Sequence, residues 1–152
     1  MPSNVHPASS AILERGGRYL LVRRSNPPAA DMYAFPGGRG EAGETPAQTA
    51  LRELAEETGI FAANPRLYAT YDLPGETKEG RGAVHFFLSV FKVEADASAV
   101  AVAADDAADI GWYTAAEIID LPVPESVRDC IARLEADRAG GSSAPFHRTG
   151  LR

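Results

Sequence analysis

The segment from Gly37 to Ile60, GGRGEAGETPAQTALRELAEETGI, contains a helix whose two ends are both marked. Thr45 suits the N-cap, with a glutamine three residues later to complete a capping box, and Pro46 suits the first helical position. Gly59 suits the residue just past the end, because glycine readily adopts the left-handed conformation found there. These signals predict one short helix over residues 46–58, preceded by a glycine-rich loop.

The predicted helix carries an acidic face. At about 100° per residue, Glu53, Glu56 and Glu57 share one face. The apolar stripe that includes Ala50 and Leu54 lies roughly 120° away from them. Such an acidic face is most often a solvated surface. The alternative is a site for a hard divalent cation, Mg²⁺ or Mn²⁺, which takes carboxylate oxygens as ligands and can bridge them to a phosphate.

Strand patterns and helix patterns alternate along the rest of the chain. The predicted strands are residues 8–13, 18–24, 66–73, 83–95 and 110–114, and the further predicted helices are residues 114–120 and 124–138. The first two strands flank ERGG, a turn of the kind that hairpins use. The apolar strand 83–95 has few polar positions on either face, which is typical of a strand covered on both sides. The order therefore predicts an α/β fold with a mixed β-sheet between helices.

Length and charge limit the classes of function. A chain of 152 residues that is 45% hydrophobic fits one domain with a substantial core, which we place at residues 1–137. Residues 138–152, rich in glycine, serine and basic side chains, are predicted to form a flexible tail. The formal net charge of −6, with no run of lysine or arginine, argues against a nucleic acid partner.

Cysteine usage and hydropathy predict the location of the protein. The single cysteine, Cys130, cannot form an internal disulfide, which suits a reducing compartment. The first ten residues have neither the basic nor the apolar region of a secretion signal, and no window approaches the roughly 18 apolar residues of a membrane span. We expect a cytoplasmic protein with no membrane partner.

The spacing from Gly38 to Ile60 resembles the sequence box of the Nudix hydrolase family, G-x5-E-x7-R-E-U-x-E-E-x-G-U, where U is aliphatic. Every fixed position of the box is met. The resemblance implies an α/β/α sandwich over about residues 5–137. It also implies hydrolysis of a nucleoside diphosphate linked to another group, with one to three divalent cations.

A second motif overlaps this box. Residues 38–43 satisfy G-x-G-x-x-G, the pattern of dinucleotide-binding loops. That fold needs a strand ending at the first glycine and a helix starting at the third, whereas the caps here start the helix at Pro46. The acidic stretch would also repel a pyrophosphate held only by backbone N–H groups. The overlap is therefore read as coincidental.

The resemblance to Nudix hydrolases implies a role for each box residue. The implied metal ligands are Glu53, Glu56, Glu57 and the carbonyl of Gly37, with Mg²⁺ or Mn²⁺ as the cofactor. Arg52 is expected to orient the glutamates through charged hydrogen bonds, and Glu44 to support the loop. The implied catalytic residues are Glu56, Glu53, Glu57, Arg52 and Glu79.

The general base is left open among several carboxylates, because family members differ in the one they use. Glu56 is the preferred candidate. The loop DLPGETKEGRG offers Glu79 and Glu76 as alternatives. The further acidic candidates are Asp105, Asp106 and Asp109. Each loop acid could equally be an ordinary solvated charge.

Substrate choice rests on weaker signals. The substrate-binding candidates are Arg23, Arg24, Gly37, Gly38, Arg39 and Pro74. Pro74, fifteen residues past Gly59, resembles a proline of the ADP-ribose-hydrolysing branch, but it is also an ordinary turn proline beside glycine.

Three functions follow from the resemblance, each with a small-molecule nucleotide as partner. The first is hydrolysis of ADP-ribose or a related nucleotide sugar, in a branch where homodimers are common. The second is housecleaning of normal or oxidised nucleoside triphosphates. The third is a non-catalytic nucleotide sensor, whose usual mark is the loss of box carboxylates. None is lost here.

Overall fold

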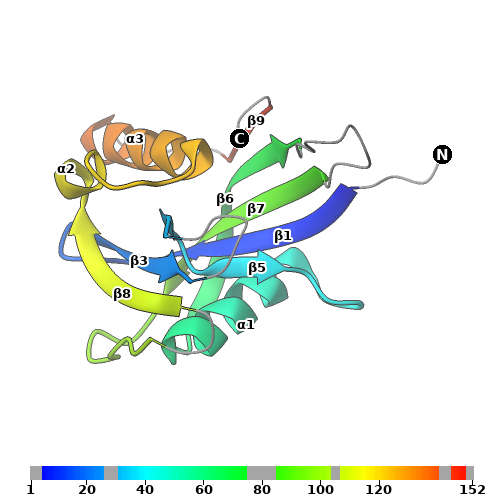
Figure 1. The fold of residues 1–152 in the computed structure, drawn as a ribbon, viewed down its shortest axis with the longest axis horizontal. Coiled ribbons are helices and arrows are strands. Elements are labelled where there is room, and N and C mark those ends of the chain that lie inside the picture. The colour runs from blue at the N-terminus through cyan, green and yellow to red at the C-terminus, as the bar shows by residue number, and fades with distance from the viewer. Residues whose placement is uncertain (1–4, 26–30, 75–84, 104–106, 141–144, 150–152) are drawn as a thin grey trace.

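The structure is a computed structural model that describes residues 5–25, 31–74, 85–103, 107–140 and 145–149 (Figure 1). Its elements are β1 (Val5–Ile12), β2 (Glu14–Arg15), β3 (Arg18–Arg24), β4 (Tyr33–Ala34), β5 (Gly37–Arg39), α1 (Pro46–Thr58), β6 (Ala63–Leu73), β7 (His85–Glu94), β8 (Ala107–Thr114), α2 (Ala115–Ile118), α3 (Glu125–Gly140) and β9 (Phe146–Arg148). Within the described ranges, no helix is both long enough and apolar enough to span a membrane.

Two β-sheets lie at the centre of the fold. The larger has the strand order β5-β1-β7-β6-β9 and is mixed, because β1/β7 and β6/β9 pair in parallel while β1/β5 and β6/β7 pair antiparallel. In the smaller sheet, β3 pairs antiparallel with β2, β4 and β8. Figure 1 shows α1 on one side of the strands and α2 with α3 on the other. The predicted α/β/α sandwich with a mixed sheet is confirmed.

The predicted hairpin of residues 8–13 and 18–24 forms only at its tip. Glu14 pairs with Tyr19, and Arg15 pairs with Arg18. Beyond this point β1 lies between β5 and β7, whereas β3 pairs along its length with β8. A turn signal sets only the pairs next to the turn. The remaining partners are chosen by burial, since both strands bury successive residues on both faces.

Successive residues of one strand point into two different cores. Ile12 packs in a cluster with Ile131 of α3. Its neighbours Ala11 and Leu13 pack in a second cluster with Leu54 of α1. This alternation follows from the two-residue period of a strand. As a result, the apolar stripe of α1 packs against one face of the strands. The acidic stripe of α1, formed by Glu53, Glu56 and Glu57, lies beside β5.

Helix α1 begins and ends where its caps predict. The side chain of Thr45 accepts a hydrogen bond from the backbone N–H of Gln48 at 3.2 Å, and the Gln48 side chain accepts one from the Thr45 backbone at 2.8 Å. Gly59 has φ of 77° and donates its N–H to the carbonyl of Ala55. The predicted helix over residues 46–58 is confirmed at both ends.

The described part of residues 138–152, the predicted flexible tail, includes regular structure. Helix α3 continues to Gly140, and β9 pairs in parallel with β6. The reason is Phe146, whose ring lies edge-on to Tyr68 and Tyr71 at centroid distances of 5.3 and 6.0 Å. The glycine and serine composition of the segment hid this one apolar anchor. The division into a domain at residues 1–137 and a separate tail stays a prediction.

Phe146→Ala is expected to lower the free energy of unfolding by about 1–3 kcal/mol, because it removes two edge-to-face ring contacts and a half-buried side chain. Urea unfolding monitored by circular dichroism measures this loss. Arg148→Ala is the control in the same strand. It breaks an exposed ion pair with Asp129 at 3.4 Å and is expected to cost less than about 1 kcal/mol. Equal losses in the two variants would contradict the anchoring role of Phe146.

Candidate active site

Strand β5 brings two glycines against other parts of the chain at distances that no side chain allows. A Cβ on Gly38 would lie 2.5 Å from Oε2 of Glu53, and a Cβ on Gly37 would lie 2.4 Å from the carbonyl oxygen of Ser9. Real Cβ atoms do not approach other atoms so closely, so a side chain at Gly37 would clash with backbone atoms, and one at Gly38 would displace the Glu53 carboxylate. The backbone of β5 can therefore lie directly against the acidic stripe of α1.

Two glutamates of that stripe meet in a buried position. Glu57 is 4% exposed, its carboxyl hydrogen-bonds that of Glu53, and it accepts a long hydrogen bond from the N–H of Gly37 at 3.4 Å. Burial, followed by the contact with Glu53, raises the pKa of Glu57 to about 9, although the charge of Arg24 acts in the opposite direction. This pKa favours the protonated form of Glu57 at neutral pH in the metal-free protein.

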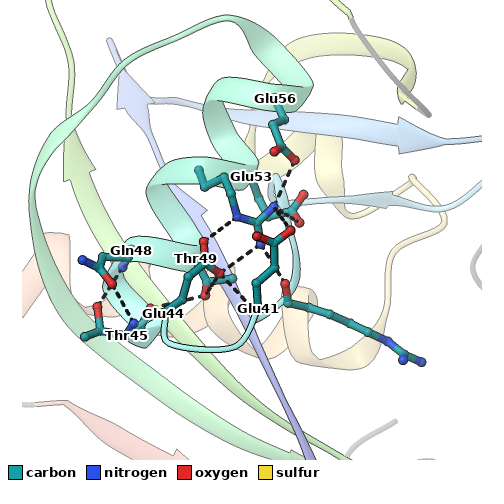
Figure 2. Close-up of polar contacts among 9 residues, drawn as sticks. Glu41, Glu44, Thr45, Gln48, Thr49, Glu53 and Glu56 are labelled. Atoms are coloured by element: carbon teal, nitrogen blue, oxygen red, sulfur yellow. Dashed lines mark hydrogen bonds and ion pairs between the residues drawn. The ribbon is translucent and has the colours of Figure 1, made fainter.

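The guanidinium of Arg52 joins Glu53 and Glu56 of this acidic stripe to Glu44 in the loop before it. Figure 2 shows where these three glutamates lie. Its Nη1 donates to Oε2 of Glu53 and to Oε1 of Glu56, each at 3.0 Å. Its Nε and Nη2 donate to the two oxygens of Glu44 at 2.5 and 3.1 Å, and Nη2 also donates to the carbonyl of Arg39 at 2.9 Å. One planar side chain thus sets the positions of three carboxylates, which suits the fixed fork of donors that arginine provides.

Glu44 is the anion that fixes Arg52 in place. Its Oε1 also accepts hydrogen bonds from the N–H of Glu41 at 2.9 Å and from Oγ1 of Thr49 at 2.8 Å. The hydrogen bond from Arg52, followed by the one from the Glu41 backbone, lowers the pKa of Glu44 to about 2. Glu44 therefore stays ionised at any pH near neutral, and it anchors the guanidinium without competing for protons.

A family model described as NUDIX domain matches residues 5–134 of the chain. The chain belongs to the NUDIX domain family. A NUDIX hydrolase from Nitrosomonas europaea, known from its crystal structure, superposes with a TM-score of 0.77 at 22% identity. That match covers 100% of this chain and 82% of the other, and it supports the fold.

The relatives of this NUDIX chain are named for several different substrates. An ADP-ribose pyrophosphatase from Methanocaldococcus jannaschii is 36% identical over 78 residues, which are 50% of this chain and 46% of that protein. A putative 8-oxo-dGTP diphosphatase 2 from Mycobacterium tuberculosis is 34% identical over 139 residues, or 88% of this chain and 90% of that protein. The first match and two other curated ones span only 45–48% of the relative, so the chain covers about half the length of these proteins.

Nudix hydrolases generally use divalent metal ions, and the acidic stripe of this chain has donors that suit one. Glu53 and Glu57 supply hard carboxylate oxygens, the kind of ligand that Mg²⁺ and Mn²⁺ take. Among the described residues, no group of three or more His, Cys, Asp or Glu side chains is set to hold a metal ion as it stands. Glu53 and Glu56 each give one oxygen to Arg52, so the second oxygen of each carboxylate is the one that could bond a cation.

The substrate-binding candidates of the NUDIX domain make different contacts in the structure. Arg24 lies close enough to the acidic stripe for its charge to lower the pKa of Glu57. Arg23 instead pairs with Asp31 at 2.9 Å. The guanidinium of Arg39 lies over the ring of Phe86, 5.0 Å from its centroid, while its carbonyl supports Arg52. Exposed Pro74 follows β6 at the border of the described residues. Of the arginines, Arg24 has the clearest link to the site.

The candidate general bases also lie in different parts of the chain, and the structure describes only some of them. Glu56 lies on the acidic stripe with 47% of its side chain exposed. The Asp109 carboxylate accepts a hydrogen bond from the N–H of Ile110 on β8. Four of the loop candidates, Glu76, Glu79, Asp105 and Asp106, lie outside the described residues. Glu56 is therefore the candidate base with an observed position in the site.

Two contacts of the site were not predicted from the sequence. Thr49 is buried in α1 and bonds Glu44, and Oε2 of Glu41 lies 3.7 Å from Nη1 of Arg52. The spacing does carry a signal for Thr49, because it stands four residues before Glu53 and therefore on the same helix face. Spacing alone does not show which neighbour its hydroxyl contacts.

Gly38→Ala is expected to displace the Glu53 carboxylate, because the new Cβ would lie within 2.5 Å of it. We expect Mn²⁺ binding, measured by calorimetry with the metal alone, to weaken at least about tenfold. Gly43→Ala is the matched control in the same loop. It strains a backbone with φ of 84° but meets no atom within 4 Å. A Gly38→Ala protein with wild-type Mn²⁺ affinity would contradict the close approach.

Proposed function

We propose that this protein is a divalent-cation-dependent pyrophosphohydrolase that cleaves a nucleoside diphosphate linked to another group, with ADP-ribose or a related nucleotide sugar as the leading substrate. The observation that carries the proposal is the contact of buried Glu57 with Glu53, where the backbone of β5 donates to Glu57 and Arg52 donates to Glu53. This arrangement occurs in a chain that matches the NUDIX domain family. A solvated acidic surface would require neither the burial of Glu57 nor the hydrogen bonds from Arg52.

The side chains of the site are assigned different roles. A bound Mg²⁺ or Mn²⁺ polarises phosphoryl oxygens and lowers the pKa of water. Glu53, Glu56, Glu57 and the Gly37 carbonyl are the groups that would hold it. Arg52 keeps Glu53 and Glu56 in register and cancels part of their repulsion.

Glu56 is the preferred general base. It is the most exposed of the carboxylates bonded by Arg52, so it can reach a water molecule and release the proton to solvent. Glu79 stays the alternative. The base would act on water that attacks phosphorus in line while the second phosphate leaves.

The preference for a nucleotide sugar rests on two observations. The matched half of the archaeal relative belongs to a protein named ADP-ribose pyrophosphatase. Pro74 stands at the end of β6, at the spacing from the box that resembles the ADP-ribose branch. The positive charge of Arg24 near Glu57, with Arg23 beside it on β3 and Arg39 on β5, would favour the diphosphate of such a substrate.

Hydrolysis of nucleoside triphosphates, including oxidised ones, is the second candidate. The specific observation in its favour is coverage, because the relative named putative 8-oxo-dGTP diphosphatase 2 matches over 90% of its own length. The box residues would serve either substrate in the same way. The choice therefore depends on groups that hold the nucleoside and the leaving group rather than on the acidic stripe.

A substrate panel tests the proposal. The purified protein is incubated with Mg²⁺ or Mn²⁺ and ADP-ribose, other nucleotide sugars, dinucleoside polyphosphates, or common and oxidised nucleoside triphosphates. AMP and ribose 5-phosphate from ADP-ribose, at rates well above the others, are the expected products. Pyrophosphate from triphosphates would favour the second candidate. No turnover on any compound, with nucleotide binding retained, would leave a sensor domain.

A further inference from the structure

Thr49 occupies a buried position between the acidic stripe and the loop that precedes α1. It is 1% exposed, and its Oγ1 lies 2.8 Å from Oε1 of Glu44 and 3.3 Å from the carbonyl of Thr45 (Figure 2). A hydroxyl has one hydrogen to donate. The shorter distance and the charge of the carboxylate both favour Glu44 as its acceptor. The hydroxyl is therefore directed toward the loop rather than back along its own helix.

The loop lies directly over this hydroxyl. A Cβ on Gly40 would come within 3.3 Å of Oγ1 of Thr49 and within 3.4 Å of the ring of Pro7. The N–H of Gly40 donates to the carbonyl of Pro7 at 2.9 Å, which ties the loop to β1. Thr49 is thus the point at which the buried side of α1 contacts the loop that carries Glu44.

Thr49 is linked to the carboxylates of the acidic stripe through Glu44 and then Arg52. Both oxygens of Glu44 bond Arg52, and Nη1 of Arg52 bonds Glu53 and Glu56. Glu44 is a loop side chain with three rotatable bonds and 16% exposure, whereas Thr49 is β-branched and held in a helix. A rigid donor on α1 therefore limits where the Glu44 carboxylate can lie, and Glu44 limits where the guanidinium can lie.

We propose that Thr49 is a positioning residue of this site, and that its hydroxyl sets the Arg52 guanidinium, through Glu44, at the distance that aligns Glu53 and Glu56. Its importance for turnover rests on the proposed function, while its effect on Arg52 does not. The competing account is that the hydroxyl only satisfies the Thr45 carbonyl, as threonines inside helices often do. In that case its removal would change stability and nothing at Arg52.

The test compares Thr49→Val, which keeps the shape and removes the hydroxyl, with Thr49→Ser, which keeps the hydroxyl. Thr58→Val is the matched control. Thr58 is fully buried in the same helix, and its Oγ1 donates to the Leu54 carbonyl at 2.7 Å instead of to the loop. The ¹⁵N NMR signal of the Arg52 Nε–H group reports the bond to Glu44 in the metal-free protein. Thr49→Val is expected to move this signal, while Thr49→Ser and Thr58→Val leave it near the wild-type position.

Calorimetric titration with Mn²⁺ alone provides a second readout. Thr49→Val is expected to weaken binding about three- to tenfold, less than direct loss of a group that bonds a metal ligand, and Thr49→Ser is expected to restore it. With any substrate found active, kcat of Thr49→Val should fall about tenfold while KM changes less than about twofold. Indistinguishable Arg52 signals and Mn²⁺ affinities in the valine and serine variants would overturn the proposal. A wild-type protein without turnover would instead contradict the proposed function, and the Arg52 and Mn²⁺ measurements would still decide the role of Thr49.

Discussion

Glu57→Gln is expected to lower turnover at least about a hundredfold while leaving the fold intact. The substitution removes a negative oxygen from the candidate metal site, and loss of a catalytic metal ligand removes several kcal/mol of transition-state stabilisation. The fold should tolerate it because glutamine has the shape of the protonated carboxyl. Burial raises the pKa of Glu57 to about 9, so the metal-free wild type already holds this carboxyl in its neutral form at pH 7.

Two measurements separate the loss of metal from the loss of fold. In the absence of metal, the melting temperature of Glu57→Gln should equal or exceed that of the wild type at pH 7. Mn²⁺ should then raise the melting temperature of the wild type and not that of the variant, since a ligand stabilises only the protein that binds it. A variant that keeps both its turnover and its Mn²⁺-induced shift would remove Glu57 from the site.

Glu56→Gln provides the comparison within the stripe. It should also reduce turnover about a hundredfold if Glu56 holds metal or acts as the base. Glu41→Gln is the control in the adjoining loop, because Glu41 is 66% exposed and lies 3.7 Å from Arg52. We expect it to change turnover less than about threefold. An active Glu56→Gln enzyme with normal metal stimulation would shift attention to the carboxylates after β6.

Arg52→Lys is expected to reduce turnover by about 30- to 100-fold, although the charge is conserved. Lysine has one ammonium group, so it cannot bond both oxygens of Glu44 and also reach Glu53 and Glu56. The glutamates should then lose their common alignment and repel one another. Steady-state kinetics across a Mn²⁺ series should show that saturating metal restores only part of kcat, because the ligands are present but misplaced.

Arg18→Lys is the control for replacing an arginine that forms an ion pair. The Arg18–Glu117 pair is exposed, at 3.2 Å, and should contribute less than about 1 kcal/mol to stability and nothing to turnover. A wild-type turnover of Arg52→Lys would show that charge alone, rather than the geometry of the guanidinium, supports the site.

Local signals in the sequence predicted helix α1 with both of its ends, because a capping box and a C-terminal glycine act within a few residues of each other. They also predicted the acidic stripe, since helical periodicity alone places Glu53, Glu56 and Glu57 on one side. The family box then indicated which chemistry this stripe serves. These features depend only on residues that lie within one or two helical turns of each other.

Features that depend on distant partners could not be predicted in this way. The strands that flank ERGG pair mainly with other strands, and Phe146 orders a segment whose composition resembles a tail. Pairing and anchoring depend on which apolar surfaces meet after folding, and a short stretch of sequence does not contain that information.

By itself, the sequence determined the family, the helix and the set of carboxylates, because these depend on spacing along one chain segment. Only the tertiary structure decided how those carboxylates differ. Packing of α1 against β5 buries Glu57 beside Glu53 and leaves Glu56 exposed on Arg52. The physical reason is that charge, proton affinity and access to water depend on surroundings supplied by other strands, which spacing cannot encode.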